Sequence, residues 1–221
     1  MSTLDATHDD PTVAIASDRT HALLGQVMGY VAVTVAFAAL GAYLGRDLSG
    51  GLGLVLLIAT IPVVIGLNVA SARGREQLAI ALLFGLGLLL GLAIAPVIAD
   101  YANGDPAALW QAAGATAAFV AATGAYGYAT RRDLSSWGRT LFWALLALIV
   151  FGIVAIFLSV PSENVIYAVA GLVIFGGFTI VDFNRLRRST PDAAVPIAAG
   201  IFLDIFNVFL LALDLFGGRR D

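Results

Sequence analysis

The chain has 221 residues, of which 60% are hydrophobic and 12% are charged, and its mean hydropathy is +0.92. Soluble domains are typically about 45–50% apolar and about 25% charged, so this composition cannot cover a water-facing surface. The apolar composition and a net charge of −3 also exclude a disordered chain and a nucleic-acid binder. Cysteine and lysine are absent, which excludes disulfides, thiolate metal sites and Schiff-base lysines.

The first 25 residues are polar and lack the basic start and short apolar core of a cleavable signal peptide. We therefore expect residues 1–25 to form a cytoplasmic tail that stays on the protein. Seven apolar blocks follow, each about 20 residues or longer, which is enough for a helix to cross a hydrocarbon core of about 30 Å. The blocks are residues 26–45, 51–72, 77–99, 107–129, 138–159, 165–184 and 195–216.

The breaks between these blocks are too short to hold another domain. The sequence therefore predicts one all-α membrane domain, a seven-transmembrane-helix bundle over residues 26–217, followed by a short C-terminal tail at residues 218–221. The arginines predict its orientation, because cytoplasmic loops carry an excess of basic residues. Nine of the 12 arginines fall on the side of the N-terminal tail and three on the other side, which places the N-terminus in the cytoplasm.

The end of the chain fits this orientation less well. Seven crossings place Arg219 and Arg220 outside, whereas a re-entrant last block would bring them into the cytoplasm. The length of that block favours a complete crossing.

Two similar segments close the first and fourth blocks on opposite sides of the predicted membrane. Residues 38–43 read AALGAY and residues 121–126 read AATGAY, and each segment is followed by RDLS, at residues 46–49 and 132–135. A three-plus-three inverted repeat with one additional helix predicts this arrangement and places the seventh helix at the centre of the bundle. Chance similarity between segments rich in alanine and glycine is the alternative.

Two aspartates lie inside predicted spans. Asp204 lies about 13 Å below the start of the seventh block, where a carboxylate costs on the order of 3 kcal/mol. Asp182 lies near the cytoplasmic end of the sixth block, shortly before Arg185. The connector between the two helices is short, so the carboxyl groups can meet in the cytoplasmic half of the bundle. The alternatives are that Asp204 only hydrogen-bonds to neighbouring helices and that Asp182 only pairs with Arg185.

If the two aspartates meet, they form a proton-sensitive site. Two carboxylates in a low-dielectric environment cannot both ionise cheaply, so the pair shares a proton and changes its charge with pH. In its ionised form the pair offers hard oxygen ligands suited to Ca²⁺.

Other polar residues lie near this predicted site. Asn207 lies about 60° and Asp214 about 80° from Asp204 on a helical wheel, which forms a polar stripe on the last helix. Arg73 and Arg75 lie at the cytoplasmic end of the second block, and either is a candidate partner for a carboxylate in that half of the bundle. The alternative for each arginine is simple anchoring at the cytoplasmic surface.

Nothing in the sequence indicates catalysis. His8 and His21 have no second ligand at metal-binding spacing. The contexts of Asp182 and Asp204 lack the Gly-x-Gly-Asp pattern of intramembrane aspartyl proteases. We therefore expect a protein that is not an enzyme and that holds no permanently bound cofactor.

Three segments resemble the Bax inhibitor-1 family, also called the transmembrane Bax inhibitor motif family. They are residues 126–138 (YGYATRRDLSSWG), Asp182 with Arg185, and residues 198–209 (AAGIFLDIFNVF). The resemblance implies a seven-helix bundle whose last helix is enclosed by the other six, in a prokaryotic plasma (inner) membrane. It also implies a pH-sensitive calcium leak with Asp182 and Asp204 as the sensor, Ca²⁺ as the permeant ion and an arginine of the second helix as a latch.

Two functional hypotheses follow. The first is a pH-sensitive calcium-permeable leak channel that interacts with membrane lipid, Ca²⁺ and protons. The second block has no acidic residue before Glu76, so on this hypothesis the aspartate pair is the principal carboxylate site on the path. The second hypothesis is a non-conducting regulator that binds a membrane protease or another membrane protein through its acidic N-terminal tail.

Overall fold

The computed structural model describes residues 11–48, 50–157 and 165–217, and these residues form seven long α-helices and one short 3-10 helix. The N-terminal ten residues and the C-terminal tail at residues 218–221 lie outside this part of the chain. The helices are α1 (Pro11–Leu44), α2 (Gly50–Ala72), α3 (Glu76–Gly104), α4 (Pro106–Ala129), α5 (Ser135–Phe157), α6 (Val165–Leu186), η1 (Pro191–Ala193) and α7 (Ala194–Gly217). Each predicted block corresponds to one long helix, which confirms the all-α fold class.

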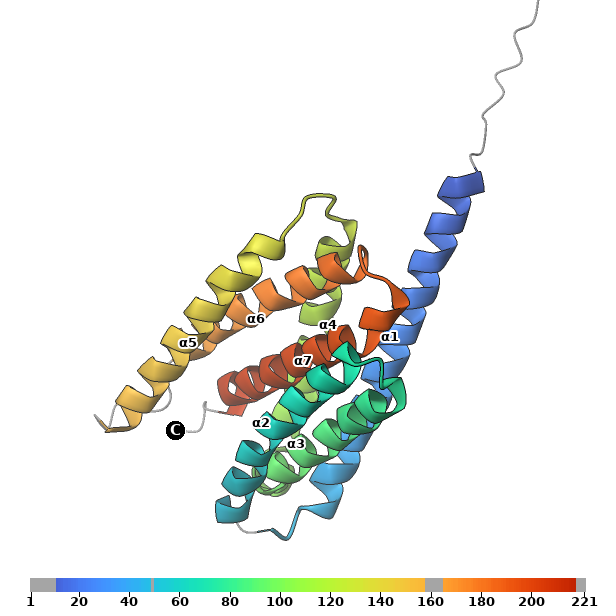
Figure 1. The fold of residues 1–221 in the computed structure, drawn as a ribbon. Helices are drawn as coiled ribbons and strands as arrows, with labels where there is room; N and C mark the ends of the chain where they lie inside the picture. The colour runs from blue at the N-terminus through green and yellow to red at the C-terminus, as the bar shows by residue number, and fades with distance from the viewer. Residues whose placement is uncertain (1–10, 49, 158–164, 218–221) are drawn as a thin grey trace, which may run out of the picture.

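The first helix starts earlier than the apolar pattern indicates. Helix α1 begins at Pro11, so residues 11–25 of the predicted tail continue the helix of the first span. Hydropathy detects where a helix becomes lipid-compatible, whereas the backbone hydrogen bonds of a helix continue into polar sequence. Figure 1 shows this part of α1 projecting beyond the other helices.

Six of the described helices are long and apolar enough to cross a membrane. Helix α4 is not among these candidates, although its 24 residues give it sufficient length. It still runs the full height of the bundle, because Ala108 packs near Leu213 at one end and Gly127 meets the backbone of Ile180 near the other. Six candidate spans are therefore found, and a seventh crossing, by α4, remains a prediction.

Small residues bring the helices of the first half together. A Cβ added to Gly91 of α3 would collide with the Ala38 carbonyl of α1, and one added to Gly87 would collide with the Thr34 carbonyl. Lipid supplies little hydrophobic drive for helix association, so backbone contact of this kind must supply the packing.

Helix α7 lies inside the bundle. It packs against α1, α2, α3, α4 and α6, and Figure 1 shows it between the α5–α6 pair and the α1–α3 group. Its buried share is the largest among the candidate spans. Helix α7 is continuous from Ala194 to Gly217, where Gly217 meets Tyr101 at the end of α3. It thus extends from one end of the bundle to the other without the break that a re-entrant segment needs.

Helix α5 has the opposite character. It packs mainly against α6, and none of the residues in its most apolar stretch is buried. Its outward-facing side chains are large and apolar, including Phe142, Trp143 and Phe151. This outward surface suits lipid. On its inner side, α5 contacts α6 and leaves space between itself and α7.

Candidate functional site

Asp204 is the buried charged side chain of the described core. It lies in the middle of α7 with 5% of its surface exposed, and its Oδ2 atom has no hydrogen-bond partner within the described part of the chain. The Thr179 hydroxyl of α6 lies beside this carboxyl group and donates a hydrogen bond of 2.9 Å to the Phe175 carbonyl. A buried polar atom without a partner is costly, so this carboxylate is a candidate for function rather than for stability.

A glycine on α7 brings the second aspartate close to the first. The Asp182 carboxylate of α6 lies against Gly200, and a Cβ at that glycine would collide with the Asp182 Oδ2 atom. Gly200 is one helical turn before Asp204, and the two carboxyl groups are close enough for their charges to interact. The structure therefore places together the two aspartates that the sequence singled out.

The two aspartates line a cavity of about 600 Å³ between α5, α6 and α7. Its walls are mostly hydrocarbon and aromatic, and Asp182, Asp204 and Asn207 contribute the amide and carboxylate groups. The lining residues are Leu145, Leu148, Ile149, Tyr167, Phe175, Phe178, Asp182, Gly200, Leu203, Asp204, Asn207, Leu210 and Leu211.

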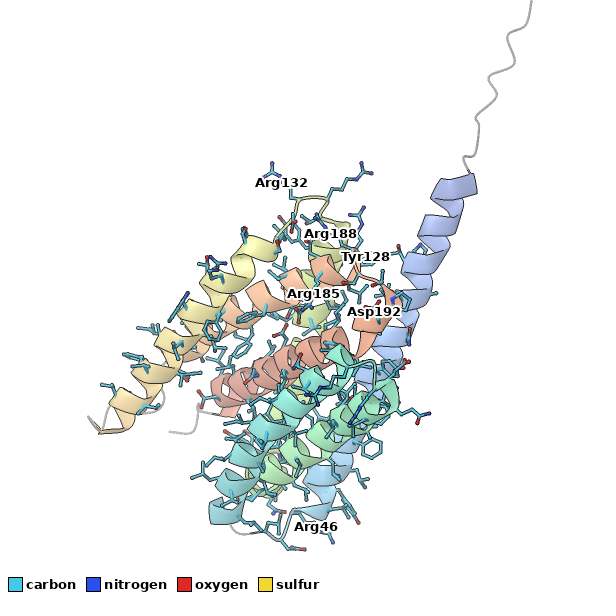
Figure 2. The ribbon with its side chains drawn as sticks, in the orientation of Figure 1. Arg46, Tyr128, Arg132, Arg185, Arg188 and Asp192 are labelled. Atoms are coloured by element: carbon cyan, nitrogen blue, oxygen red, sulfur yellow. The ribbon has the colours of Figure 1, made fainter. Side chains whose placement is uncertain are left out.

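A second cavity, of about 530 Å³, adjoins the first at Asp182 and Phe178. It is more polar and lies at the end of the bundle where arginines gather, as the labels of Arg132, Arg185 and Arg188 in Figure 2 show. Its lining residues are Asp133, Ser135, Gly138, Phe178, Val181, Asp182, Asn184, Arg185, Arg188 and Ser189. Asp182 thus stands between an arginine-rich mouth and the deeper cavity that contains Asp204.

Arg185 is the cation nearest in sequence to the pair. Its charge acts on Asp182, and both side chains line the second cavity. No ion pair within 4.0 Å joins the two in the described residues, where Arg188 instead pairs with Asp133. Asp182 is therefore not neutralised by direct contact with Arg185.

The two latch candidates lie away from the aspartates. Arg73 and Arg75 are exposed in the turn between α2 and α3, where Gly74 has a φ of +68°. Neither arginine lines the cavities that contain Asp182 or Asp204. A latch role for either one remains a prediction that requires a different arrangement of this turn.

The predicted polar stripe on α7 is only partly directed at the site. Asn207 lines the deeper cavity, and its Nδ2 atom donates a hydrogen bond of 2.7 Å to the Leu203 carbonyl. Asp214 is exposed and does not line that cavity. The stripe therefore contributes one residue beyond Asp204 to the site.

Asn184 is a structural hub that the sequence analysis did not single out. It is buried on α6, and its Nδ2 atom lies 2.9 Å from the Thr130 carbonyl and 3.1 Å from the Arg132 carbonyl. Its Oδ1 atom accepts a hydrogen bond of 3.3 Å from the Leu134 amide. Carbonyl groups at a helix C-terminus lack partners within the helix, so Asn184 satisfies the end of α4 from outside. An uncharged amide inside an apolar block was the available signal.

The loop between α4 and α5 is also fixed by Arg188, which lies in the turn just after α6. The Arg188 guanidinium donates a hydrogen bond of 2.7 Å to the Arg131 carbonyl and lies 3.4 Å from an oxygen of Asp133. The Ser135 amide donates to Asp133 at 2.9 Å, and this hydrogen bond is the main reason why the pKa of the Asp133 carboxyl lies below its usual range. The rim of the second cavity is therefore anchored to the C-terminal end of α6.

The pair offers few oxygen ligands for a metal ion. Ca²⁺ takes six to eight oxygen ligands at high-affinity sites. The described residues contain no cluster of three or more acidic or histidine side chains that could hold a metal ion. Asp182 and Asp204, with the Asn207 amide oxygen nearby, offer fewer ligands than a storage site has.

Comparison with known proteins identifies the family of the chain. The family model described as "Inhibitor of apoptosis-promoting Bax1" matches residues 20–221. The chain is 27% identical over 219 residues to the inner membrane protein YbhL of Escherichia coli K12, covering 89% of this chain and 92% of YbhL. It is 34% identical over 165 residues to the Golgi anti-apoptotic protein of vaccinia virus strain Lister, covering 73% of this chain and 68% of that protein. The chain belongs to the Bax inhibitor-1 family.

Proposed function

We propose that this membrane protein is a pH-sensitive cation leak permeable to Ca²⁺, with Asp182 and Asp204 as its gate. The observation that carries the proposal is the buried Asp204 carboxylate, which has an unpartnered oxygen and lies beside Asp182 where two cavities adjoin. A carboxylate in this position is expensive for a helix inside a membrane. Its retention is explained by a role in binding or passing a cation.

Protonation supplies the sensitivity to pH. Two carboxyl groups at close range in a low-dielectric site do not both remain ionised at low cost, so the pair exchanges protons as pH changes. Each exchange alters the charge that a permeating cation meets and the repulsion between α6 and α7. The positive charge of Arg185 also acts on the Asp182 carboxylate.

The proposed route follows the two cavities between α5, α6 and α7. From the arginine-rich mouth it passes Asp182, Asp204 and Asn207 and then reaches an apolar section that includes Leu210 and Leu211. Hydrocarbon constrictions hold channels closed by excluding water. The apolar section is therefore the barrier in this conformation, and hydration of it is the step that permits conduction.

Calcium flux into liposomes tests the proposal. Purified protein in vesicles loaded with a Ca²⁺-sensitive dye is expected to admit Ca²⁺ at a rate that changes between mildly acidic and neutral pH, because protonation changes the charge of the carboxylate pair. Asp204→Asn is expected to remove that change, whereas Asp100→Asn, at an exposed position near the end of α3, retains it. Absence of flux at every pH would refute the leak.

The proposed topology places the N-terminus and the arginine-rich end in the cytoplasm of a prokaryotic cell. In this topology α4 also crosses the inner membrane, which brings the number of crossings to seven. The excess of arginine at one end supports this orientation, and the name of the YbhL relative supports the location. In each half, the first and second helices pack against the third, which supports a three-plus-three inverted repeat. Labelling of single cysteines introduced at Arg46 and Arg132 tests the orientation, because the natural chain has no cysteine.

A second candidate function is regulation of a membrane protease or another membrane protein without conduction. It is favoured by the projection of α1 beyond the rest of the bundle, which Figure 1 shows. Such a helix offers a surface to a partner outside the bundle. This function predicts a co-purifying membrane protein that is lost when the first 20 residues are deleted, while the shortened chain stays folded.

A further inference from the structure

The cavity beside Asp204 is larger than an inorganic ion requires. Its volume is about 600 Å³, whereas one water-sized group occupies about 30 Å³ of liquid. Small-molecule sites typically have volumes of about 300–1,000 Å³, with mostly apolar walls and a few polar groups. This cavity has those properties, since Leu148, Phe175 and Leu211 are among its apolar walls.

The polar groups of the cavity are acceptors that need a donor. Asp204 Oδ2 has no hydrogen-bond partner in the described chain, and only 5% of the surface of Asp204 is exposed. Asp182 approaches from α6, and the Asn207 amide has used its nitrogen to donate to Leu203, which leaves its oxygen as an acceptor. Three acceptors thus line a single cavity along one stretch of α7.

The residues that line this cavity include two acidic side chains and no basic one. Its lining includes residues of α5, α6 and α7, and Asp182 and Asp204 are the charged members of that set. Tyr167 adds a neutral hydroxyl from α6, and Arg185 lines only the adjoining cavity. A cation entering this space is attracted by two carboxylates and meets no basic side chain among the lining residues.

We propose that this cavity binds a primary alkylammonium, with its NH₃⁺ group between Asp204, Asp182 and Asn207 and its hydrocarbon chain against Leu148 and Phe175. A primary ammonium has three N–H donors, which match the three acceptors. Charge-assisted hydrogen bonds to carboxylates are the stronger kind. Phe175 and Phe178 present aromatic rings to the same space, and such rings attract a cation. The inference uses the aspartate pair of the proposed function but does not depend on conduction.

The position of α5 gives an amphiphile a direct route from lipid. Helix α5 packs mainly against α6 and forms one wall of the cavity. An alkylamine dissolved in the membrane therefore has only this loosely held helix between it and the site.

Direct binding of n-octylammonium tests the inference. Equilibrium dialysis of the radiolabelled amine against purified protein in detergent micelles, with empty micelles as the blank, is expected to show saturable binding of one amine per chain. Octyltrimethylammonium has the same charge without N–H donors and is expected to bind about tenfold more weakly. 1-Octanol is expected to stay at the blank level. Equal binding of all three, or uptake no greater than that of the blank, would overturn the inference.

Two variants and one control variant locate the bound amine. Leu148→Trp fills the cavity and is expected to abolish saturable binding, whereas Leu146→Trp, exposed on the same helix, is expected to retain it. Asp204→Asn is expected to weaken binding about tenfold or more. Wild-type affinity in Leu148→Trp contradicts the proposed site. If a variant fails to fold, the ligand series on the natural chain still decides the question.

The result also separates this inference from the proposed function. Calcium flux without amine binding overturns only the amine site, and amine binding without calcium flux overturns only the leak.

Discussion

The two halves of the bundle share a helix order but differ in how completely they close. In both α1–α3 and α4–α6, the first and second helices pack against the third. In the first half, Gly53 of α2 meets the backbone of Ala93 and Gly91 of α3 meets that of Ala38, and the space beside α1 and α3 is an apolar cavity of about 750 Å³ shared with α4 and α7. In the second half, α5 leaves cavities that reach Asp182 and Asp204. Backbone contacts between helices therefore mark the first half, whereas the proposed site lies between the second half and α7.

The loops of the two halves differ in the same sense. Each contains the sequence RDLS, at residues 46–49 and 132–135. In the first loop, Arg46 pairs with its neighbour Asp47 at 3.6 Å, and both side chains are exposed. In the second loop, Asp133 pairs instead with Arg188, in the turn just after α6. The same residues thus serve a local contact in one half and anchor the rim of a cavity in the other.

The largest expected effect comes from adding a side chain where α1 and α3 already meet backbone to backbone. Gly91→Val puts a side chain into the Ala38 backbone, and overpacking of this kind costs about 3 kcal/mol. Gly85→Val on the same helix is the control, because a Cβ there meets nothing within 4 Å. Thermal unfolding in detergent measures both. Equal losses in the two variants would mean that the backbone contact is not what holds α1 to α3.

A smaller loss is expected when a polar link of the second half is removed. Asn184→Ala leaves the carbonyls of Thr130 and Arg132 and the Leu134 amide without this partner, at a cost of about 2 kcal/mol. Asn68→Ala is the matched change in the first half, where the amide only bonds to the Val64 carbonyl of its own helix. Denaturation should show little change for Asn68→Ala, and a similar loss in both variants would erase the difference between the halves.

Replacing the buried charge is expected to act in the opposite direction. Asp204→Asn removes a carboxylate whose Oδ2 has no partner, and we expect a gain of about 1 kcal/mol in stability at pH 8. The gain should shrink at pH 5, since the cost being removed is that of a buried charge. The melting temperature at the two pH values checks this, and a loss of stability at pH 8 would show that Asp204 is a structural residue.

The smallest effect is expected in the exposed loop. The pKa of Asp133 is held below its ordinary value of 3.8, mainly by the Ser135 amide. A carboxyl group with a lowered folded pKa stabilises the protein above its unfolded pKa, and that contribution is lost as pH falls through the folded pKa. Asp133→Asn should therefore lower the melting temperature slightly at pH 6 and by less as the pH falls below the ordinary carboxyl pKa. Asp47→Asn, for which the first loop offers only a local pair, should do less at pH 6.

The sequence was sufficient for the helices because lipid compatibility requires long apolar blocks. It was less informative about whether α4 crosses the membrane. This helix has the length of a span, but its alanines, glycines and Gln111 lower its hydropathy. It also missed the start of α1, because polar residues after Pro11 remain helical without an apolar signal.

At the site, rarity made Asp204 and Asp182 visible, since charges inside apolar blocks are expensive. Asn184 carries no charge, and its carbonyl partners lie more than 50 positions earlier in the chain, so composition did not indicate its role. The space between α5 and α7 depends on how the helices pack, which no local pattern specifies. Arg73 and Arg75 were predicted to lie in the same cytoplasmic half of the bundle as the pair, but the turn at Gly74 leaves both at the surface.

The most direct test of the account compares the pH dependence of Ca²⁺ entry into liposomes for the natural chain and Asp204→Asn, at equal amounts of folded protein. The account predicts that the rate for the natural chain changes between mildly acidic and neutral pH, and that the rate for Asp204→Asn is the same at both. An unaltered pH response in Asp204→Asn would contradict the aspartate pair as the gate.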